Sequence, residues 1–161
     1  MIRMASVDDA GDIAGIYNPY IAHTVITFEE REVTSSQMAD RISEVLSSSL
    51  PWLAADRSGQ VAAYAYAHPW KTRSAYRFSV ETAVYVHRDH VGCGLGSELY
   101  EALFAALRDR GVHVAVAGIA LPNERSIALH EKFGLRRVAH FEEVGFKFGR
   151  WIDVGYWQKV L

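Results

Sequence analysis

A predicted strand, a glycine-rich loop and an amphipathic helix follow one another between residues 77 and 111 and constrain the fold most strongly. Through Arg77–Val86 two sets of side chains alternate, one of them mainly apolar, with the period of two that a pleated strand imposes. The next segment contains Gly92, Gly94 and Gly96. Leucines then recur at every fourth position, which predicts one buried stripe of a helix: Leu95, Leu99, Leu103 and Leu107. Gly111 follows, where a left-handed glycine commonly ends a helix.

The rest of the chain predicts a mixed order of strands and helices. The predicted elements are a strand at Ile2–Ala5, a helix over Asp8–Ala22 capped by Ser6, a helix from Thr34 or Ser35 to Ser47, a hairpin of Trp52–Ala55 and Val61–Tyr66, a strand at Val112–Ile119, a helix from Asn123 to about Gly134, and strands at Leu135–Phe146 and Arg150–Val160. Because strands and helices neither alternate strictly nor segregate, we expect one central mixed α/β sheet with helices on both faces.

Length and composition limit the class of protein. The 161 residues are half apolar, so they can bury one core, and we expect a single domain over residues 1–161. A net charge of −2 argues against nucleic-acid binding. Cys93 is the one cysteine, which excludes an intrachain disulfide and suits a reducing compartment. The acidic N-terminal segment and the lack of an apolar run of about 20 residues predict a cytoplasmic protein without a membrane span.

The glycine loop favours binding of a phosphate group. Glycines let a ligand approach the backbone, and the free N–H groups of the following helix attract an anion. A Walker A loop requires a lysine, but Ser97 follows Gly96 directly. A Rossmann fingerprint requires two residues between its second and third glycines, where this loop has one. A tight turn with close strand–helix packing, without any ligand, also explains the pattern.

The segment "VYVHRDHVGCGLGSELYEAL" resembles the acyl-CoA-binding segment of the GNAT acetyltransferase superfamily. Together with "WKTRSAYRFSVETAVYV", "GIALPNERSIALHEKFG" and "VGFKFGRWIDVGYWQ", it resembles the phosphinothricin and methionine sulfoximine N-acetyltransferases over most of the chain. The resemblance implies a mostly antiparallel mixed sheet in which two strands splay apart to admit acetyl-CoA. It implies cofactor contacts at these positions: Val84, Tyr85, Val86, Gly92, Cys93, Gly94, Leu95, Gly96, Ser97 and Asn123.

The loop departs from the family pattern at two positions. Val91 stands where the family usually has Gln or Arg, and Gly92 stands where these relatives often have Arg. Because backbone amides make the phosphate cradle, we expect weaker CoA binding rather than loss of the site. Cys93 lies at a variable position of the motif with no paired base in the sequence, so we do not expect it to act as a nucleophile.

Glu81 is the candidate general base. Glutamate is depleted in strands, yet Glu81 lies in the middle of the predicted strand before the glycine loop. A solvent-facing acid on a half-exposed sheet also fits this pattern. The resemblance decides for the catalytic role, because Glu81 matches the glutamate that takes a proton from the amine in these acetyltransferases. Partial burial would raise the pKa of Glu81 and make it a stronger base.

His130 lies on a partly apolar face of the helix that Asn123 begins. A histidine there is commonly a core residue with satisfied hydrogen bonds. By resemblance, His130 replaces the tyrosine that protonates the leaving thiolate in many GNAT enzymes, and the phosphinothricin-type enzymes share the histidine. We therefore expect either a catalytic or a substrate-orienting role. Asn123 matches a cofactor-contacting position, although helix capping alone explains it.

An amino-acid-like substrate carries a carboxylate and requires a cation in its pocket. Arg77 is expected on the same strand face as Glu81, with Arg73 as a second cation and Tyr76 as an aromatic wall. By resemblance, Phe28 and Tyr17 line the same pocket. Lys71 is interpreted as an ordinary solvated charge. No metal-ligand spacing such as His-Glu-x-x-His occurs, so no metal site is predicted.

The leading hypothesis is an acetyl-CoA-dependent N-acetyltransferase for phosphinothricin, methionine sulfoximine or methionine sulfone. By resemblance, the amine attacks the thioester directly, a backbone amide near Val84 polarises the carbonyl, and the protein is a homodimer. The alternatives are acetylation of another small amine or a protein N-terminus, a non-catalytic CoA-binding sensor, and a nucleotide phosphotransferase. The missing lysine disfavours the last of these.

Overall fold

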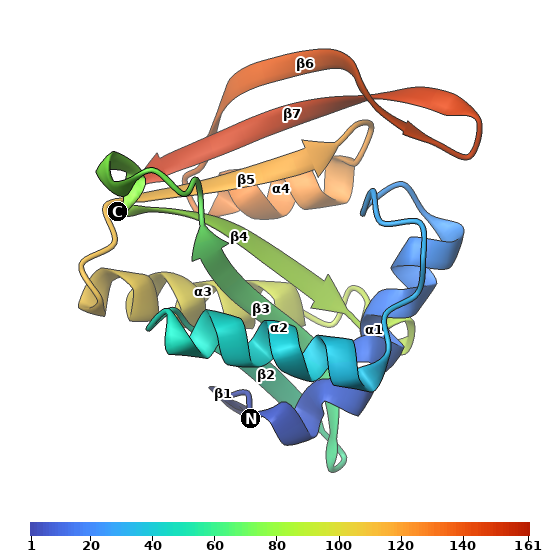
Figure 1. Ribbon diagram of the computed structural model, residues 1–161, viewed down its shortest axis with the longest axis vertical. Coiled ribbons are helices and arrows are strands. Elements are labelled where there is room, and N and C mark those ends of the chain that lie inside the picture. Colours follow the sequence, from blue (N-terminus) through green and yellow to red (C-terminus); the bar gives the residue numbers. More distant parts are fainter.

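Seven strands form one sheet in the order β1-β2-β3-β4-β5-β7-β6, and the computed structural model describes residues 1–161 (Figure 1). The strands are β1 (Ile2–Met4), β2 (Trp52–Arg57), β3 (Gln60–Pro69), β4 (Ser79–Val86), β5 (Val114–Ala120), β6 (Arg136–Lys147) and β7 (Arg150–Val160). The helices are α1 (Ala10–His23), α2 (Ser35–Ser47), α3 (Leu95–Asp109) and α4 (Glu124–Lys132), with short 3₁₀ turns η1 (Val7–Asp9), η2 (Ser74–Tyr76) and η3 (Arg88–His90). All neighbouring strands are antiparallel except β4 and β5, which confirms the predicted mixed sheet.

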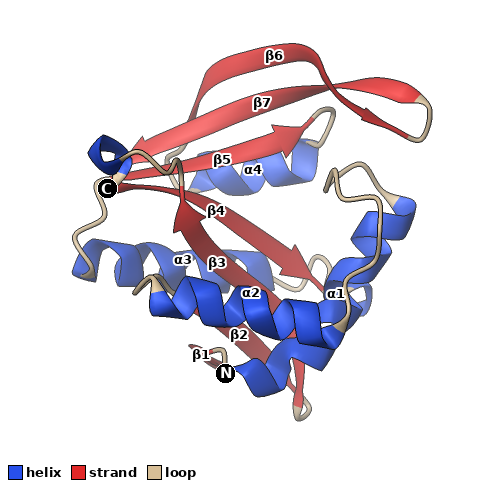
Figure 2. Ribbon diagram, in the orientation of Figure 1, coloured by secondary structure: helices blue, strands red, loops and turns tan.

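Helices cover both faces of the sheet, as predicted (Figure 2). On one face, α1 and α2 pack against β2 and β3 around Trp52 and Tyr64. On the other face, every leucine of the predicted α3 stripe is buried in the larger core, and α4 packs Ile127 and Leu129 against it. A fully buried leucine side chain contributes about 1.5–3 kcal/mol to folding. The central strands are thus held between two apolar layers.

Side-chain caps start two helices where the sequence predicts them. The Thr34 hydroxyl accepts a hydrogen bond from the Gln37 amide at 3.1 Å at the start of α2. The Asn123 side chain accepts one from the Ser126 amide at 3.1 Å at the start of α4. Each such cap stabilises a helix by about 1 kcal/mol. Gly111 has a φ of +72° just after α3, in agreement with the predicted left-handed helix end.

The predicted strand at Arg77–Val86 begins two residues later, at Ser79. Residues 74–76 form the turn η2, and Arg77 belongs to its end, because its amide hydrogen-bonds to the Ser74 carbonyl at 3.1 Å. The Arg77 guanidinium also donates to that carbonyl, at 3.2 Å. Arg77 therefore does not lie on the strand face that carries Glu81, and that part of the prediction was wrong.

Two further boundaries differ from the prediction. Ser6 precedes the short turn η1 instead of the long helix, so α1 starts at Ala10. The hairpin strands β2 and β3 continue to Arg57 and Gln60, which leaves only Ser58–Gly59 in the turn. Both turn residues have positive φ, 51° and 84°. A two-residue turn of this kind matches the twist of the paired strands, so the strands extend to it.

The strands β4 and β5 splay apart, as the resemblance implied (Figure 1). They are parallel and pair only where Ser79–Glu81 meets Val114–Val116. Beyond this point, β4 continues to Val86 and β5 to Ala120 without pairing with each other. The carboxyl ends of both strands therefore flank an opening in the sheet, and the loops to α3 and α4 leave from its two sides.

Candidate active site

A cavity of about 390 Å³ lies beside Glu81, near the point where β4 and β5 separate. Its walls come from the loop between α1 and α2, from β4 and β5, and from the β6–β7 hairpin. The lining residues are Ile26, Phe28, Glu81, Gly118, Ala120, Phe141, Val144, Val154 and Tyr156. Glu81 is the one charged residue among them. The cavity therefore offers a small ligand mainly apolar walls and a single carboxylate.

The surroundings of Glu81 make it a stronger base than an exposed glutamate. Burial raises the pKa of Glu81, while the charge of His68, a hydrogen bond with the Gly118 backbone and the charge of Lys71 each act to lower it. His68 is the residue opposite Glu81 on β3, with its Nε2 atom 3.8 Å from the carboxylate. Desolvation is the larger effect, so the proton affinity of Glu81 is raised, as predicted.

A second cavity, of about 470 Å³, lies between the end of β4, the glycine loop and the start of α4. Its lining residues are Tyr20, Ile26, Val84, Tyr85, Val86, Val91, Gly92, Gly94, Gly96, Ser97, Asn123, Arg125, Ser126 and Leu129. Eight of the ten predicted cofactor positions are among them. We call this cavity the cofactor cleft.

The loop glycines have two different local roles. Gly92 and Gly94 have φ angles of +87° and +86°, in the left-handed region that favours glycine, and no atom lies within 4 Å of where their Cβ would be. At Gly96, a Cβ would lie 3.3 Å from the Leu129 side chain, so glycine permits close packing of α3 against α4. The first N–H groups of α3 lie at this loop, and groups of this kind bind anions.

Two predicted cofactor residues lie outside the lining of the cleft. The side chain of Leu95 is buried in the core, because Leu95 begins the leucine stripe of α3. Cys93 is exposed and is not part of the lining. Val91, which the sequence resemblance marked as a departure, does line the cleft. An apolar side chain thus stands at this position of the cleft.

Tyr20 and Arg125 also line the cleft and were missed from the sequence. The Tyr20 hydroxyl donates a hydrogen bond to the Val86 carbonyl at 2.6 Å, joining α1 to the end of β4. Arg125 is the one charged residue in the lining and has no ion pair. Its position in the first turn of α4, two residues after Asn123, is a signal that could have identified it. No local signal marks Tyr20, which lies 66 positions before Val86.

His130 is buried at 4% exposure beside a small space of about 60 Å³ that borders both cavities. Its Nδ1 atom lies 2.6 Å from the Ser126 carbonyl oxygen, which can only accept, so we assign the proton to Nδ1. Nε2 then accepts a hydrogen bond from the Tyr100 hydroxyl at 2.8 Å. Burial lowers the pKa of His130, which favours the neutral ring. Both ring nitrogens already have partners within the protein.

The predicted substrate residues are only partly brought together. Phe28 lines the cavity beside Glu81. Tyr17 is buried and does not line this cavity, and its ring packs edge-on against Tyr85 with 5.0 Å between centroids. The other predicted residues, Arg73, Tyr76 and Arg77, do not line this cavity. The Arg77 guanidinium lies over the Phe78 ring, 4.5 Å from its centroid.

Lys71 is exposed, in agreement with its interpretation as an ordinary solvated charge, and its charge is the smallest of the effects that act on the pKa of Glu81. Its Nζ atom lies 4.9 Å from the centre of the Trp70 ring.

Neither a metal centre nor a membrane span is found in the molecule. No three His, Cys, Asp or Glu side chains are grouped as metal ligands. None of the helices combines the length and the apolar character of a membrane span.

Comparison with known proteins agrees with this geometry. The acetyltransferase (GNAT) domain matches residues 2–155. A phosphinothricin N-acetyltransferase from Streptomyces viridochromogenes is 40% identical over 158 residues, which cover 98% of this chain and 86% of that protein. An L-methionine sulfoximine/L-methionine sulfone acetyltransferase from Salmonella typhimurium is 38% identical over 161 residues, covering 99% and 94%.

A solved structure shares the whole fold. It is a GNAT superfamily phosphinothricin acetyltransferase from Sinorhizobium meliloti in complex with AcCoA. The two chains are 33% identical, and the match covers 100% of this chain and 88% of the Sinorhizobium chain, with a TM-score of 0.96. The predicted fold and the predicted resemblance are both confirmed. The chain belongs to the GNAT acetyltransferase family.

Proposed function

We propose that this protein is an N-acetyltransferase that uses acetyl-CoA to acetylate the amino group of a small amino-acid-like compound: phosphinothricin, methionine sulfoximine or methionine sulfone. The observation that carries the proposal is the half-buried carboxylate of Glu81 in a small cavity beside the cofactor cleft. The names of the relatives support the substrate class, and the bound ligand of the Sinorhizobium protein supports the cofactor.

Glu81 has the role of general base. An amino group is mostly protonated near neutral pH and must lose a proton before it attacks a carbonyl carbon. Glu81 takes this proton, directly or through a water molecule, and its raised pKa favours the transfer. When bound, acetyl-CoA supplies an activated acetyl group. The new N–C bond forms and the C–S bond breaks, the amine loses its proton to Glu81, and the thiolate leaves and takes up a proton from water.

The cofactor cleft has the role of binding the CoA phosphates and orienting the carbonyl. Backbone N–H groups of the loop that contains Gly92, Gly94 and Gly96 would bind the phosphates. A backbone amide near Val84 would polarise the carbonyl oxygen. Arg125 would supply the positive charge that the loop lacks at Val91 and Gly92, since it is the one cation in the lining.

We assign His130 a positioning role rather than that of a direct proton donor. In the neutral ring, Nε2 accepts a hydrogen bond from the Tyr100 hydroxyl and Nδ1 donates its proton to the Ser126 carbonyl, so the one ring proton is already engaged with the backbone. His130 would hold Tyr100 and the first turn of α4 beside the small space between the two cavities. For the substrate carboxylate, the predicted cations Arg73 and Arg77, with Tyr76, remain a prediction. Lys71 is a further candidate.

The test is release of free thiol from acetyl-CoA with a panel of amines, using the wild type and Glu81→Gln. The panel contains phosphinothricin, methionine sulfoximine, methionine sulfone, unrelated small amines and a peptide with a free N-terminus. We expect thiol release with the amino-acid analogues and a loss of about 10²–10⁴-fold in kcat/KM in Glu81→Gln.

Each other result favours a different function. Faster acetylation of the peptide or of unrelated amines identifies the alternative substrate class. CoA binding without thiol release from any amine supports the sensor hypothesis. Full activity of Glu81→Gln at every pH removes the base assignment.

We also propose that the protein is a cytoplasmic homodimer. Large apolar side chains on the β6–β7 hairpin support a contact with a second copy, because they lie outside the cavity lining and remain more than 40% exposed in the single chain: Val138, Phe146, Phe148 and Trp151. Exposed apolar surface of this extent commonly marks an interaction site.

A further inference from the structure

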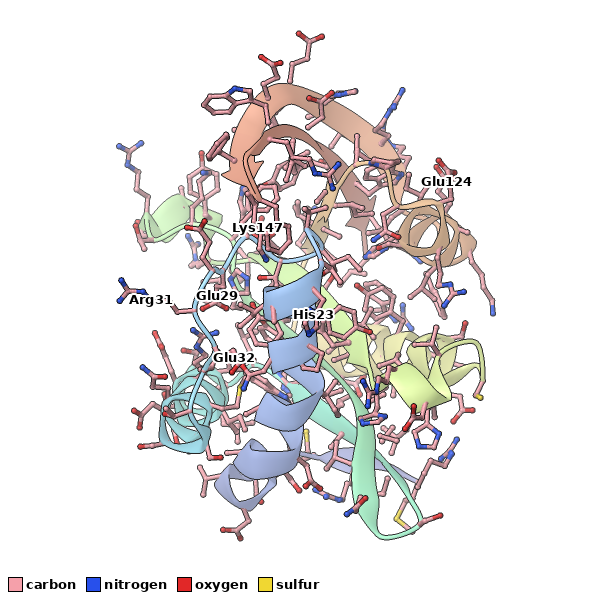
Figure 3. The ribbon with its side chains drawn as sticks, turned by 90° about the vertical axis from the view of Figure 1, so that its right-hand side faces the viewer. His23, Glu29, Arg31, Glu32, Glu124 and Lys147 are labelled. Carbon is pink, nitrogen blue, oxygen red and sulfur yellow. The ribbon has the colours of Figure 1, made fainter.

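The loop over residues 24–34, between α1 and α2, forms one side of the cavity beside Glu81. It contributes Ile26 and Phe28 to the lining. The loop contains no regular secondary structure, and its charged residues Arg31 and Glu32 are exposed. Figure 3 shows the Arg31 side chain pointing away from the body of the protein. Since no helix or strand fixes this segment, its side-chain contacts must set the position of the two lining residues.

Contacts from α1 and α2 hold the base of the loop. Asn18 forms two hydrogen bonds with the backbone of Val33, at 2.8 Å to its amide and 3.0 Å to its carbonyl. Arg41 on α2 forms an ion pair with Glu29, with one N···O distance of 2.9 Å. Tyr17 also hydrogen-bonds to Glu29. These contacts tie the loop to the helices but not to the opposite wall of the cavity.

Lys147, on β6, provides the one hydrogen bond between this loop and the β6–β7 hairpin. Its Nζ atom donates to the Thr27 carbonyl at 2.8 Å. Lys147 is only 1% exposed and has no carboxylate partner within 4 Å. Figure 3 shows it beside Glu29, where the loop passes the hairpin. Burial lowers the pKa of Lys147, while the charges of Glu30 and Glu29 act to raise it. These charges and the hydrogen bond to Thr27 together offset part of the cost of burying an ammonium group.

Gly145 provides a second contact on the same face of β6, two residues before Lys147. A Cβ atom at position 145 would overlap the ring of Phe28. The Phe28 ring therefore lies directly on the β6 backbone. The hydrogen bond to Thr27 and the ring contact at Phe28 involve adjacent loop residues, so they fix the loop and the hairpin at one separation.

We propose that Lys147 is a positioning residue for the amine site, which holds the Thr27 carbonyl so that Phe28 stays against Gly145 and sets the width of the cavity beside Glu81. The proposal rests on the proposed function for the identity of that cavity as the amine site. It assigns to Lys147 a role in substrate discrimination, because the walls of a wider cavity would lose contact with the side chain of a small amine substrate.

The experiment compares Lys147→Met and Lys147→Arg with the wild type. Met keeps a side chain of similar length but removes the donor, and Arg keeps a donor. Lys159→Met is the matched control, since Lys159 also donates to a backbone carbonyl, that of Phe133 at 2.6 Å, outside the cavity lining. The measurements are KM for the amine, KM for acetyl-CoA, and hydrogen–deuterium exchange of residues 24–34.

We expect Lys147→Met to raise KM for the best amine at least tenfold, to change KM for acetyl-CoA less than twofold, and to speed exchange in residues 24–34. Lys147→Arg should recover most of the amine affinity, and Lys159→Met should leave both the amine KM and the loop exchange unchanged. The exchange result tests the role of Lys147 even if no amine is acetylated, and so separates this proposal from the proposed function.

Two results would overturn the proposal. One is unchanged loop exchange and an amine KM within twofold of the wild type in Lys147→Met. The other is an equal rise of both KM values, as expected from a general loss of stability. If Lys147→Met does not fold, Gly145→Ala displaces Phe28 from the other side. An unchanged amine KM in that variant would also overturn the proposal.

Discussion

Glu81 lies opposite His68, so the two side chains form an acid–base unit across β3 and β4. Burial raises the pKa of Glu81, and the positive charge of protonated His68 lowers it. The carboxylate is the active form of a general base, so activity depends on the pH at which this proton is lost. The charge of His68 therefore helps to set the pH range over which Glu81 acts as a base.

The pH profile of kcat/KM for the amine should rise through an acidic limb with a midpoint above the ordinary glutamate value of 4.5. His68→Asn removes a charge that lowers the pKa of Glu81, so we expect the limb to move to higher pH. The measurement is initial-rate kinetics between about pH 4.5 and 8 with saturating acetyl-CoA. Glu81→Gln, which should lack the limb, is the control. A limb that stays in place in His68→Asn contradicts the assignment.

The contribution of Arg125 to CoA binding can be measured separately, because Arg125 is the one charged residue in the lining of the cofactor cleft. We expect Arg125→Gln to weaken CoA binding about two- to fivefold at low salt, with a smaller difference at high salt, because an exposed charge contributes up to about 1 kcal/mol. Isothermal titration calorimetry with CoA gives the affinity. Pantetheine, which lacks the phosphates, should bind both proteins equally. An equal loss for CoA and pantetheine would mean that Arg125 acts through the structure of α4 instead.

At the scale of elements, the turn from β4 into α3 depends on the backbone of Gly94. It lies at the start of α3 with a φ of +86° and with open space around it. A side chain there is strained by its backbone conformation alone. A substitution at Gly94 therefore tests backbone strain without a change in packing.

Gly94→Ala should lower the free energy of unfolding by about 1–2 kcal/mol and weaken CoA binding, since alanine disfavours the left-handed conformation by that amount. Gly15→Ala is the matched control: Gly15 lies within α1, also has no atom within 4 Å of a Cβ, and has no positive φ. It should stabilise the protein by about 0.4–1 kcal/mol. Urea denaturation measures both effects. Equal behaviour of the two variants would show that the loop conformation is not strained for alanine.

At the scale of the whole molecule, the β6–β7 hairpin has two faces with different roles. Its inner face carries Gly145 and Lys147 against the α1–α2 loop. Its outer face carries Phe146 and Trp151, which pack together at 4.8 Å between ring centres and remain more than half exposed. One hairpin thus forms a wall of the amine cavity and presents an apolar surface.

We expect the wild type to have about twice the 18.0 kDa mass of one chain and Trp151→Glu to have the mass of a monomer. The charge added to the apolar surface would oppose its burial against a second copy. Light scattering coupled to size exclusion gives the masses, and circular dichroism checks that the variant is folded. A wild type with the mass of one chain contradicts the homodimer proposal.

Local sequence patterns determined most of the elements and much of the cofactor cleft. Alternation, helical periodicity and capping residues act within a few positions, so they identified α2, α3, α4, the strands that flank the cleft and the glycine loop. The motifs around Glu81 and the glycine loop are specific enough to indicate the family by themselves. The start of β4 was predicted too early, because the side chain of Arg77 follows the alternation while its backbone belongs to η2.

Only the tertiary structure decided which distant residues complete the site. Lys147 meets Thr27 across 120 positions, and His68 faces Glu81 only through the register of β3 with β4. Tyr100 and His130 are likewise joined by the packing of α3 against α4. Such pairs have no periodicity or spacing, because the order of the strands and the packing of helices on the sheet bring them together. The sequence by itself therefore determined the chemistry, and the fold decided the shape of the pocket in which it acts.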